Sequence, residues 1–395
     1  MVTTLRNVVV VGGSYVGISA AQQLASVLPV THRVLLVEPH SHFHHLFAFP
    51  RFAIVAGHEH KAFIPYTGIW KDVPDPSIHA VVRAKVLDVQ PNRVVLDRQW
   101  EGSTEIPFDF VTFATGTRLT APGTMESDDK APSIAYFQDY QAKVAAAKSI
   151  VIIGGGAVGV QMATDLRELH PDKKVTLVQS RDRLMPRFHS QFHDIIAERF
   201  SELGVDLVLN NRVVIPDGGF PEDGRTFNVQ LKDGSEIETQ LVIRATGQTP
   251  NNQLLAKLPA SSPDSIINPD NGFIRVKPTM QFLDPQYPNM FAVGDIADTG
   301  AHKAARPGAG QAAVVAKNIA AIIAGLQPTD KIEINPAGIH MTLGMVKNIV
   351  FRNPGQEDGA EPSYFWRDDG KKDMGINGVW GRRGVTVTRE DDYKL

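Results

Sequence analysis

Two glycine-rich turns are the segments whose residue types and spacing most directly suggest chemistry. The apolar run 8–11 leads into Gly12, Gly13, Ser14 and Gly17, and the apolar run 150–153 leads into Gly154, Gly155, Gly156 and Gly159. In such a motif the first glycine makes a tight turn, the second lets the backbone approach a pyrophosphate, and the third lets a helix pack on the strand. The repeat therefore predicts two dinucleotide sites in one chain.

The elements around each turn fit this interpretation. Helix-forming stretches follow at 18–27 and 160–169, and β-rich runs follow them at 33–37 and 174–178. Strand, glycine turn, helix and strand in this order make the βαβ nucleotide-binding unit. A further apolar strand ends in Ala114, Thr115 and Gly116, and the same ending recurs as Ala245, Thr246 and Gly247. The repeat therefore extends beyond the glycines.

The two copies differ at two positions. Ser14 takes the middle glycine place of the first copy, where a small side chain is tolerated and its hydroxyl could bond a phosphate oxygen. Glu38 ends the second strand of that copy, and a carboxylate there accepts both hydrogens of a ribose diol, which predicts an FAD site. Gln179 holds the equivalent place in the second copy, with Arg181 nearby, so NADPH should be accepted there. The alternative is that Arg181 is an ordinary solvated loop charge.

Composition limits the other functions. The 395 residues predict two to three domains, and the formal net charge of -3 argues against a nucleic acid as the main partner. Zero Cys excludes cysteine-ligated metal sites, cysteine nucleophiles and dithiol relays. The early first strand leaves no room for a signal peptide, and no apolar run is long enough to span a membrane. We expect a cytoplasmic protein, although the closing Tyr-Lys-Leu loosely matches a peroxisomal ending.

These segments together resemble the pyridine-nucleotide-dependent oxidoreductases with two dinucleotide folds. The motif Val293-Gly294-Asp295 is shared with this wide family, and within it the chain resembles the apoptosis-inducing-factor-like branch that includes ferroptosis suppressor protein, through the histidine-rich stretch 41–45 and the tail segment 336–343. The resemblance implies an α/β fold with two Rossmann-like domains, the second inserted in the first, and a C-terminal α+β domain. The implied boundaries are 1–120 and 247–325 for FAD, 121–246 for NAD(P)H, and 326–395 for the C-terminal domain.

The activity implied by the resemblance is that of an FAD-dependent NAD(P)H:quinone oxidoreductase. Hydride would pass from NAD(P)H to flavin N5 and on to a quinone or another small electron acceptor, without a cysteine relay. Three departures from the branch stand out. Gln161 replaces a Glu that is common in the nicotinamide-site helix, Ser14 replaces a glycine, and Val2 replaces the glycine that a myristoyl anchor needs.

Individual residues receive predicted roles. Asp295 should bond a ribityl hydroxyl, ahead of a helix expected at about 308–324 that aims its positive end at the flavin. Lys303 is the predicted catalytic residue, where a cation would stabilise anionic flavin or a quinol oxyanion; a surface lysine is the alternative. Arg51 could pair with the pyrophosphate or form a surface ion pair. The predicted cofactor contacts are Gly12, Gly13, Ser14, Gly17, Glu38, His45, Arg51, Val82, Ala114, Thr115, Gly116, Gly154, Gly156, Gly159, Gln179, Arg181, Thr246, Gly247, Gly294 and Asp295.

Several alternatives stay open. The histidines at 40, 42, 44 and 45 suggest a metal by composition, but no acidic partner is evident, so we predict no metal site and assign His44 and His45 to a loop over the flavin. The acceptor could instead be a small electron-transfer protein, or the chain could be a redox-sensing interaction protein. A homodimer and a peripheral contact with lipid droplets, mitochondria or other membranes are also open. In the tail, 349–351 and 384–388 are expected strands, with polar loops at 356–362 and 367–372.

Overall fold

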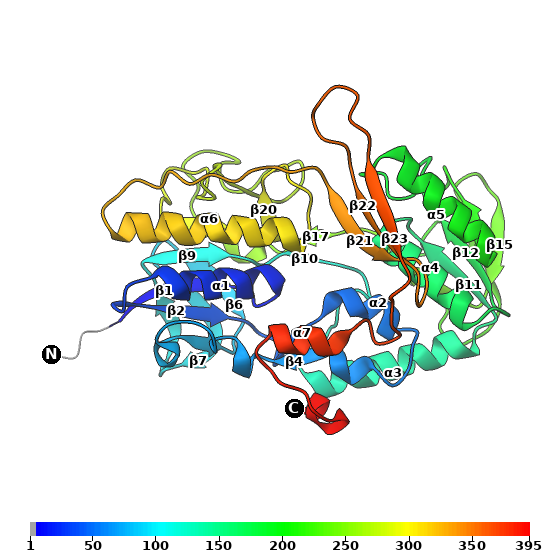
Figure 1. The fold of residues 1–395 in the computed structure, drawn as a ribbon, viewed down its shortest axis with the longest axis horizontal. Coiled ribbons are helices and arrows are strands. Elements are labelled where there is room, and N and C mark those ends of the chain that lie inside the picture. Colours follow the sequence, from blue (N-terminus) through cyan, green and yellow to red (C-terminus); the bar gives the residue numbers. More distant parts are fainter. Residues whose placement is uncertain (1–4) are drawn as a thin grey trace.

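A computed structural model describes residues 5–395; Val2, on which the missing myristoyl anchor was argued, lies outside the described residues. Two parallel sheets lie side by side, each with helices packed on it (Figure 1). The mixed α/β fold with Rossmann-like units is confirmed by the strand order and by structural neighbours.

The first sheet combines strands from distant parts of the chain, in the order β19-β9-β1-β2-β5. All of its pairings are parallel. Its strands are β1 (Arg6–Val11), β2 (His32–Val37), β5 (Ala80–Val82), β9 (Phe110–Phe113) and β19 (Met290–Ala292). Helices α1 (Tyr15–Val27) and α6 (Ala305–Ile323) pack together over this sheet (Figure 1).

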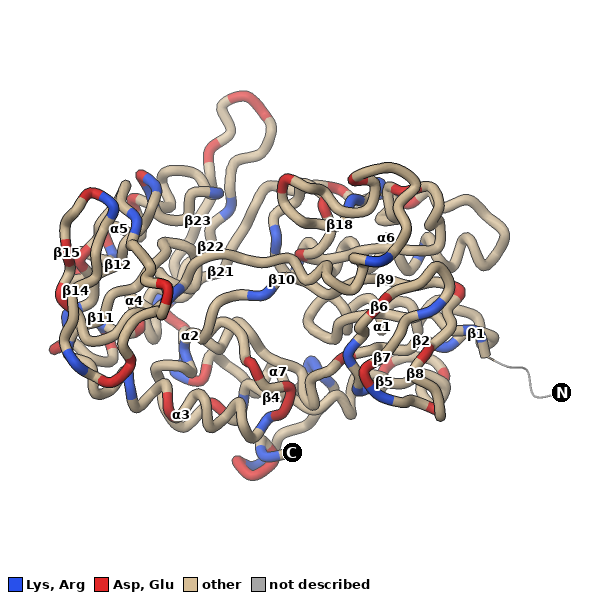
Figure 2. Tube along the Cα trace, turned by 180° about the vertical axis from the view of Figure 1, so that it is seen from behind, with Lys and Arg blue, Asp and Glu red and all other residues tan. Residues whose placement is uncertain are grey.

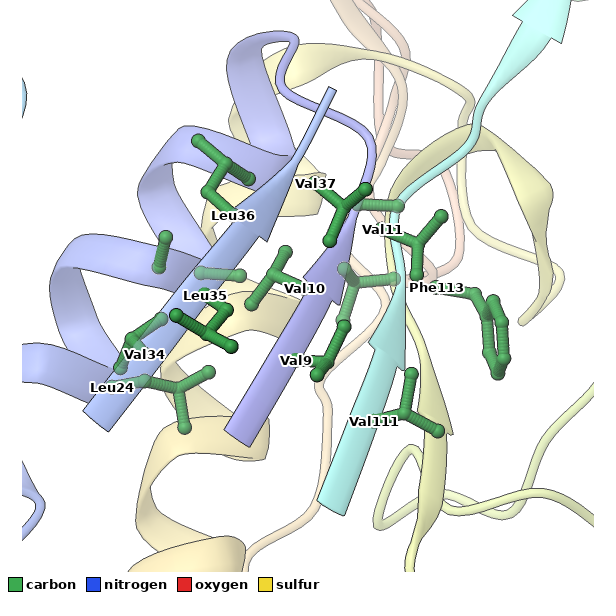
Figure 3. Packing of buried hydrophobic residues seen from close by; sticks show 14 of the residues in the cluster. Val9, Val10, Val11, Leu24, Val34, Leu35, Leu36, Val37, Val111 and Phe113 are labelled. Atoms are coloured by element: carbon green, nitrogen blue, oxygen red, sulfur yellow. The ribbon is translucent and has the colours of Figure 1, made fainter. Parts of the chain in front are cut away.

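The apolar runs explain why these strands lie at the centre of the sheet. Val9 and Val10 are fully buried, as are Leu35 and Leu36 on the neighbouring strand. Figure 3 shows these side chains on the two faces of the sheet, and α1 covers one of the two faces. Continuous runs of buried valine and leucine are typical of parallel strands that are covered on both faces.

The second sheet has the order β13-β12-β11-β16 and is also parallel. Its strands are β11 (Ser149–Ile153), β12 (Lys174–Val178), β13 (Asp206–Val208) and β16 (Leu241–Arg244). Helices α4 (Ala157–Leu169) and α5 (Ser190–Leu203) share the core of one face. The hairpin of β14 (Phe227–Gln230) and β15 (Glu236–Thr239) shares the core of the other.

Smaller elements join and surround the two sheets. The chain passes between the two sheets at β10 (Thr117–Arg118) and again at β17 (Thr249–Pro250), and these two short strands pair with each other. The remaining elements before residue 300 are β3 (His42–His44), α2 (Phe49–Phe52), β4 (Phe63–Pro65), β6 (Val86–Gln90), β7 (Arg93–Trp100), β8 (Ser103–Pro107), α3 (Lys130–Ala146), β18 (Ile274–Arg275) and β20 (Ala297–Asp298).

The C-terminal region packs on both halves of the molecule. The antiparallel sheet of β21 (Gly338–Thr342), β22 (Asn348–Arg352) and β23 (Ser363–Arg367) shares a core with the second sheet. Helix α7 (Ile376–Arg382) shares a core with the first sheet and lies beside β4 in Figure 1. The expected strand 349–351 is therefore present. The expected strand 384–388 is wrong, because this segment follows α7 as an irregular stretch packed on the first half.

Surface features add little to this arrangement. Basic and acidic residues are interspersed over both halves (Figure 2), as expected from the nearly balanced composition. Within residues 5–395, no helix combines the length and apolar character needed to cross a bilayer.

Two candidate nucleotide sites

The first glycine turn packs directly on the end of β9. Gly12 has a φ of +104°, and a Cβ there would lie 2.6 Å from the carbonyl oxygen of Ala114. A Cβ on Gly17 would lie 1.7 Å from the carbonyl oxygen of Gly12. Both positions therefore require glycine, and the close packing brings the Ala114–Gly116 segment against the start of α1.

Glu38 lies at this turn as a buried hydrogen-bond acceptor. The backbone N–H of Gly13 donates to its Oε2 at 2.5 Å, while the backbone N–H of His40 donates to its Oε1 at 3.0 Å and the His40 ring bonds the same oxygen. Burial would raise the pKa of Glu38, but these hydrogen bonds from His40 and Gly13 hold it below its usual value. Val82 supports the arrangement, because its carbonyl accepts from the Glu38 N–H at 3.0 Å.

Two tyrosines, missed in the sequence analysis, complete the surroundings of this turn. The Tyr66 hydroxyl donates to the carbonyl of Gly13 at 2.9 Å. The Tyr15 hydroxyl and His45 Nδ1 are 2.7 Å apart. Burial, and secondarily Arg383 and Arg382, lower the pKa of His45 to about 3, so this histidine is neutral near pH 7. Tyr15 holds a variable place within the first glycine motif and Tyr66 lies outside the motifs, so the sequence did not point to their hydroxyl contacts.

The start of α1 is suited to hold a phosphate group. Ser14 is the N-cap of α1, and among the described residues its side chain makes no capping hydrogen bond. The first N–H groups of a helix and its dipole favour an anion at this end. Together with the carboxylate of Glu38, the turn therefore fits an adenine dinucleotide such as FAD.

Asp295 and Lys303 lie near each other at the approach to α6. Burial raises the pKa of Asp295, against the lowering effects of Lys303 and Arg187. The Lys303 ammonium donates to the carbonyl of Ala297 and lies 4.0 Å from the ring centroid of Phe273. Gly294, just before Asp295, has a φ of +74° and donates its N–H to Gln311 of α6 at 2.7 Å. This contact ties the Gly-Asp turn to the helix.

The second glycine turn repeats the first in detail. Gly154 has a φ of +113°, and a Cβ there would lie 2.4 Å from the carbonyl oxygen of Ala245. A Cβ on Gly159 would lie 2.0 Å from the carbonyl oxygen of Gly154. The N–H of Gly155 donates to Gln179 Oε1 at 3.1 Å. Gln179 thus takes the geometric place of Glu38 without its charge.

The mouth of the second turn is open. A Cβ on Gly156 would meet no atom within 4 Å, which leaves room for a pyrophosphate to approach the backbone. Beside it, a small cavity of about 30 Å³ is lined by Val158, Ala245 and Gly247 together with residues of the crossing segment 119–123. Thr246 packs against Gly154, with its methyl group 3.2 Å from the Cβ position there. The arrangement fits a second dinucleotide.

Two arginines, Arg181 and Arg183, lie in the loop that follows Gln179. Arg181 is exposed, and its carbonyl accepts from the N–H of Asn210 at 2.9 Å. The amide of Gln179 donates to the carbonyl of Arg183 at 3.0 Å. These contacts fix the loop backbone, while contact of Arg181 with a 2′-phosphate stays a prediction.

Arg51 does not lie where a pyrophosphate contact requires it, and the expected role is wrong. Its guanidinium is fully buried and binds Asp165 of α4 through two hydrogen bonds of 2.5 and 2.9 Å. It also donates to the carbonyls of Gly344 and Lys371 at 2.9 and 3.2 Å. Through these contacts Arg51 joins α2, α4 and the C-terminal region. A carboxylate on the apolar side of a helix was the signal that could have revealed this pair.

A larger cavity lies between the two halves. Its volume is about 350 Å³, and its lining combines Arg187 with the loop Gly300–His302 and with Ile334, Asn335 and Ala337. Arg187 follows the second glycine unit, while the loop follows Asp295. A bound molecule in this cavity would therefore contact both nucleotide-binding halves.

The clustered histidines have separate partners. His40 bonds Glu38, which corrects the expectation that no acidic residue accompanies them. His42 contacts the Leu395 carbonyl oxygen at 3.1 Å, and His45 bonds Tyr15. Buried His44 packs against Phe63 and Phe49. In the part of the chain described, no group of three or more His, Cys, Asp or Glu side chains is arranged to hold a metal ion.

Comparisons with known proteins agree with this geometry. Residues 6–318 match the family described as pyridine nucleotide-disulphide oxidoreductase. The chain is 36% identical to Fe-regulated protein 8 of Mycosarcoma maydis, covering 97% of this chain and 96% of that protein. It is 30% identical to ferroptosis suppressor protein 1 of Mus musculus, covering 79% and 80% respectively. The fold resembles the sulfide:quinone oxidoreductase from Aquifex aeolicus, with a TM-score of 0.71, 19% identity, and 95% and 90% coverage.

The repeated glycine turns, the paired acceptors Glu38 and Gln179 and the family match lead to one assignment. The structural similarity supports the fold, and the sequence relatives support the branch. The chain belongs to the pyridine nucleotide-disulphide oxidoreductase family, in the branch of ferroptosis suppressor protein 1 and the apoptosis-inducing factor homologs, and is an FAD-dependent NAD(P)H oxidoreductase.

Proposed function

We propose that this oxidoreductase reduces a quinone, with NAD(P)H as the electron donor. The observation that carries the proposal is the absence of Cys from a 395-residue chain with two dinucleotide-binding turns. The relatives that reduce disulphides need a thiol pair to accept electrons from the flavin. This sequence offers none, so a small oxidant that reaches the flavin directly is the simplest acceptor, and a flat apolar quinone suits that role.

The residues divide the work between binding and orientation. The FAD that this site would hold would supply a hydride acceptor for NAD(P)H and an electron donor for the acceptor. Glu38, through the Gly13 turn, holds the adenosine end, and Asp295 is proposed to hold the ribityl chain. Gln179 and the open place at Gly156 hold the second dinucleotide. Two dinucleotides held by one chain would meet at a lower entropy cost than two free cofactors.

Lys303 remains the proposed catalytic residue. Burial lowers the pKa of Lys303, while the neighbouring carboxylates of Asp295 and Asp298 raise it. A cation beside a developing negative charge stabilises it more in a dry site than in water. The domain boundaries at residues 120, 246 and 325, the homodimer and a peripheral membrane contact are also kept as proposals.

A turnover assay tests the proposal. Purified protein is supplied with FAD, and consumption of NADH or NADPH is followed with a soluble short-chain quinone. We expect turnover well above that of free FAD at the same concentration. Turnover no faster than free FAD contradicts quinone reduction, and faster turnover with a ferredoxin or rubredoxin would favour an electron-transfer protein as acceptor.

A glycine pair provides the matched control. In Gly156→Val the new side chain enters open space, so the fold should persist while the second dinucleotide is obstructed. We expect a KM for NAD(P)H raised by at least about tenfold, with FAD content unchanged. Gly310→Ala in α6 also places its Cβ in open space and should leave both unchanged. A normal KM in Gly156→Val would remove the assigned position of the second nucleotide.

A further inference from the structure

The segment after α7 is fixed against the first glycine unit by close contacts. Trp380 is fully buried, and its indole N–H donates to the carbonyl of Lys61 at 2.8 Å. The backbones of Gly68 and Gly384 are in contact, since a Cβ on Gly384 would lie 2.2 Å from the Gly68 carbonyl oxygen. Gly384 also has a φ of +75°. This packing places Arg383, between α7 and Gly384, at a defined position.

Arg383 contacts aromatic rings and has no counter-ion among the described residues. Its Cζ atom lies 4.3 Å from the ring centroid of Phe43 and 5.6 Å from that of Tyr15. Its Nε is buried and lacks a hydrogen-bond partner within residues 5–395. Burial lowers the pKa of Arg383, and the groups that perturb it further are Tyr15, Arg382 and Tyr66, none of which is a carboxylate.

A guanidinium in these surroundings needs an anion. Withdrawing a charge from water without a partner is costly, and a buried N–H without an acceptor adds to the cost. The contact with Phe43 occupies the face of the guanidinium, so its N–H edges stay available for an acceptor in the plane. Glu38 accepts hydrogen bonds from Gly13 and His40 and is not among the groups that perturb Arg383.

The position of Arg383 indicates which anion it meets. Tyr15, beneath the guanidinium, is the first residue of α1, directly after Ser14 at the helix N-cap. Tyr66, which perturbs Arg383, donates its hydroxyl to the carbonyl of Gly13. The arginine is therefore beside the turn where the positive end of α1 and the Ser14 hydroxyl favour a phosphate.

We propose that Arg383 binds the pyrophosphate of FAD, so that the C-terminal segment completes the first dinucleotide site. Arg51, which was expected to have this role, instead donates to Asp165. The proposal rests on FAD as the cofactor of the first turn and names a residue from the opposite end of the chain. It implies that FAD binding and packing of the segment after α7 stabilise each other.

A binding experiment with a neighbouring control tests this role. FAD is titrated into cofactor-free Arg383→Met protein and followed by quenching of flavin fluorescence. We expect a Kd raised about 10- to 100-fold, as for loss of a charge-assisted hydrogen-bond pair. Arg382→Met is the matched control, because Arg382 is exposed and adjacent, and its FAD affinity should change by less than about twofold. Unchanged affinity in Arg383→Met overturns the proposal.

Competitors separate pyrophosphate binding from a structural role. ADP retains the pyrophosphate and adenosine lacks it, so Arg383→Met should weaken competition by ADP and leave competition by adenosine unaltered. Equal weakening of both contradicts the assignment. If Arg383→Met fails to fold, Arg383→Lys takes its place, and its affinity for ADP is expected to be intermediate. An ADP affinity equal to that of the unaltered protein would contradict the proposal. No quinone is present, so failure here is distinct from failure of the quinone proposal.

Discussion

The two glycine turns share one geometry and differ in charge. In the first turn the N–H of Gly13 donates to a side-chain oxygen of Glu38, and in the second the N–H of Gly155 donates to a side-chain oxygen of Gln179. Both acceptors stand at the end of the neighbouring strand. Both turns also pack on an Ala-Thr-Gly segment. The first acceptor is an anion paired with His40, while the second is a neutral amide bonded to the carbonyl of Arg183.

This difference separates what the fold requires from what each nucleotide requires. The fold needs an acceptor of a given length for the glycine N–H, and Glu or Gln serves equally. The charge of the acceptor side chain can therefore differ between the two sites according to the nucleotide, because a carboxylate favours a ribose diol and repels a 2′-phosphate.

The largest effect is expected at the ion pair between the halves. Arg51→Met leaves the Asp165 carboxylate buried without a partner, which should reduce the free energy of unfolding by about 3–5 kcal/mol. Chemical denaturation measures this loss. The double variant Arg51→Met/Asp165→Leu removes both charges and should recover most of the stability; an equally unstable double variant would show that the charge is not the cause.

Exchange of the two acceptors tests the comparison itself. Glu38→Gln keeps a hydrogen-bond acceptor but removes the charge, so FAD affinity should fall about tenfold while the fold persists. Gln179→Glu introduces a charge that repels a 2′-phosphate, so kcat/KM should fall for NADPH much more than for NADH. Fluorescence titration and steady-state kinetics provide the values. An unaltered FAD affinity in Glu38→Gln would mean that acceptor geometry alone is sufficient.

Substitution of Asp295 should have a smaller effect, limited to the binding of the flavin. Asp295→Ala removes the carboxylate proposed to bond the ribityl chain, and we expect purified protein with a reduced flavin content. The ratio of flavin to protein absorbance measures it. Asp298→Ala, which alters a carboxylate in the same segment, is the comparison variant; full flavin occupancy in Asp295→Ala would contradict the role.

The charged acceptor should also make the first site sensitive to pH. Burial alone raises the pKa of Glu38, but hydrogen bonds lower it overall, so its contribution is present above its unfolded pKa and is lost as pH falls through the folded value. Burial alone lowers the pKa of His40, but Glu38 and Asp128 raise it overall, so its contribution is lost as pH rises through the raised value. The thermal stability of the FAD-bound protein should therefore decline as the pH falls through the folded pKa of Glu38 and as it rises through the folded pKa of His40. Glu38→Gln should flatten this profile, and an unchanged profile would exclude the pair as its origin.

The smallest effect is predicted at Arg181. Because this side chain is exposed, Arg181→Ala should reduce kcat/KM for NADPH by a few-fold, about 1 kcal/mol or less, and leave NADH nearly unchanged. Equal losses for the two nucleotides would assign Arg181 to the solvated surface.

The sequence predicted well what depends on local patterns. The valine run before Gly12 and the isoleucine run before Gly154 became parallel strands, and the expected helix at about 308–324 is α6 at Ala305–Ile323. Glycine spacing, strand hydrophobicity and the residue that ends the second strand are all encoded within about 30 residues.

What the sequence missed depends on contacts between distant segments. Asp165 lies 114 positions from Arg51, so no local pattern pairs them. Residues 384–388 have the alternation of a strand, but after α7 they pack on the first half without a neighbouring strand to pair with. Arg383 meets Phe43 and Tyr15 only because α7 returns to the first half. Such placements follow from the assembled core rather than from propensity.

Anaerobic titration of the FAD-loaded protein with NADH, followed by addition of a soluble quinone, tests the central claim most directly. The account predicts that NADH bleaches the flavin absorption band stoichiometrically and that the quinone restores it within the turnover time. A flavin band that neither NADH nor NADPH bleaches, or one that the quinone does not restore, would contradict it.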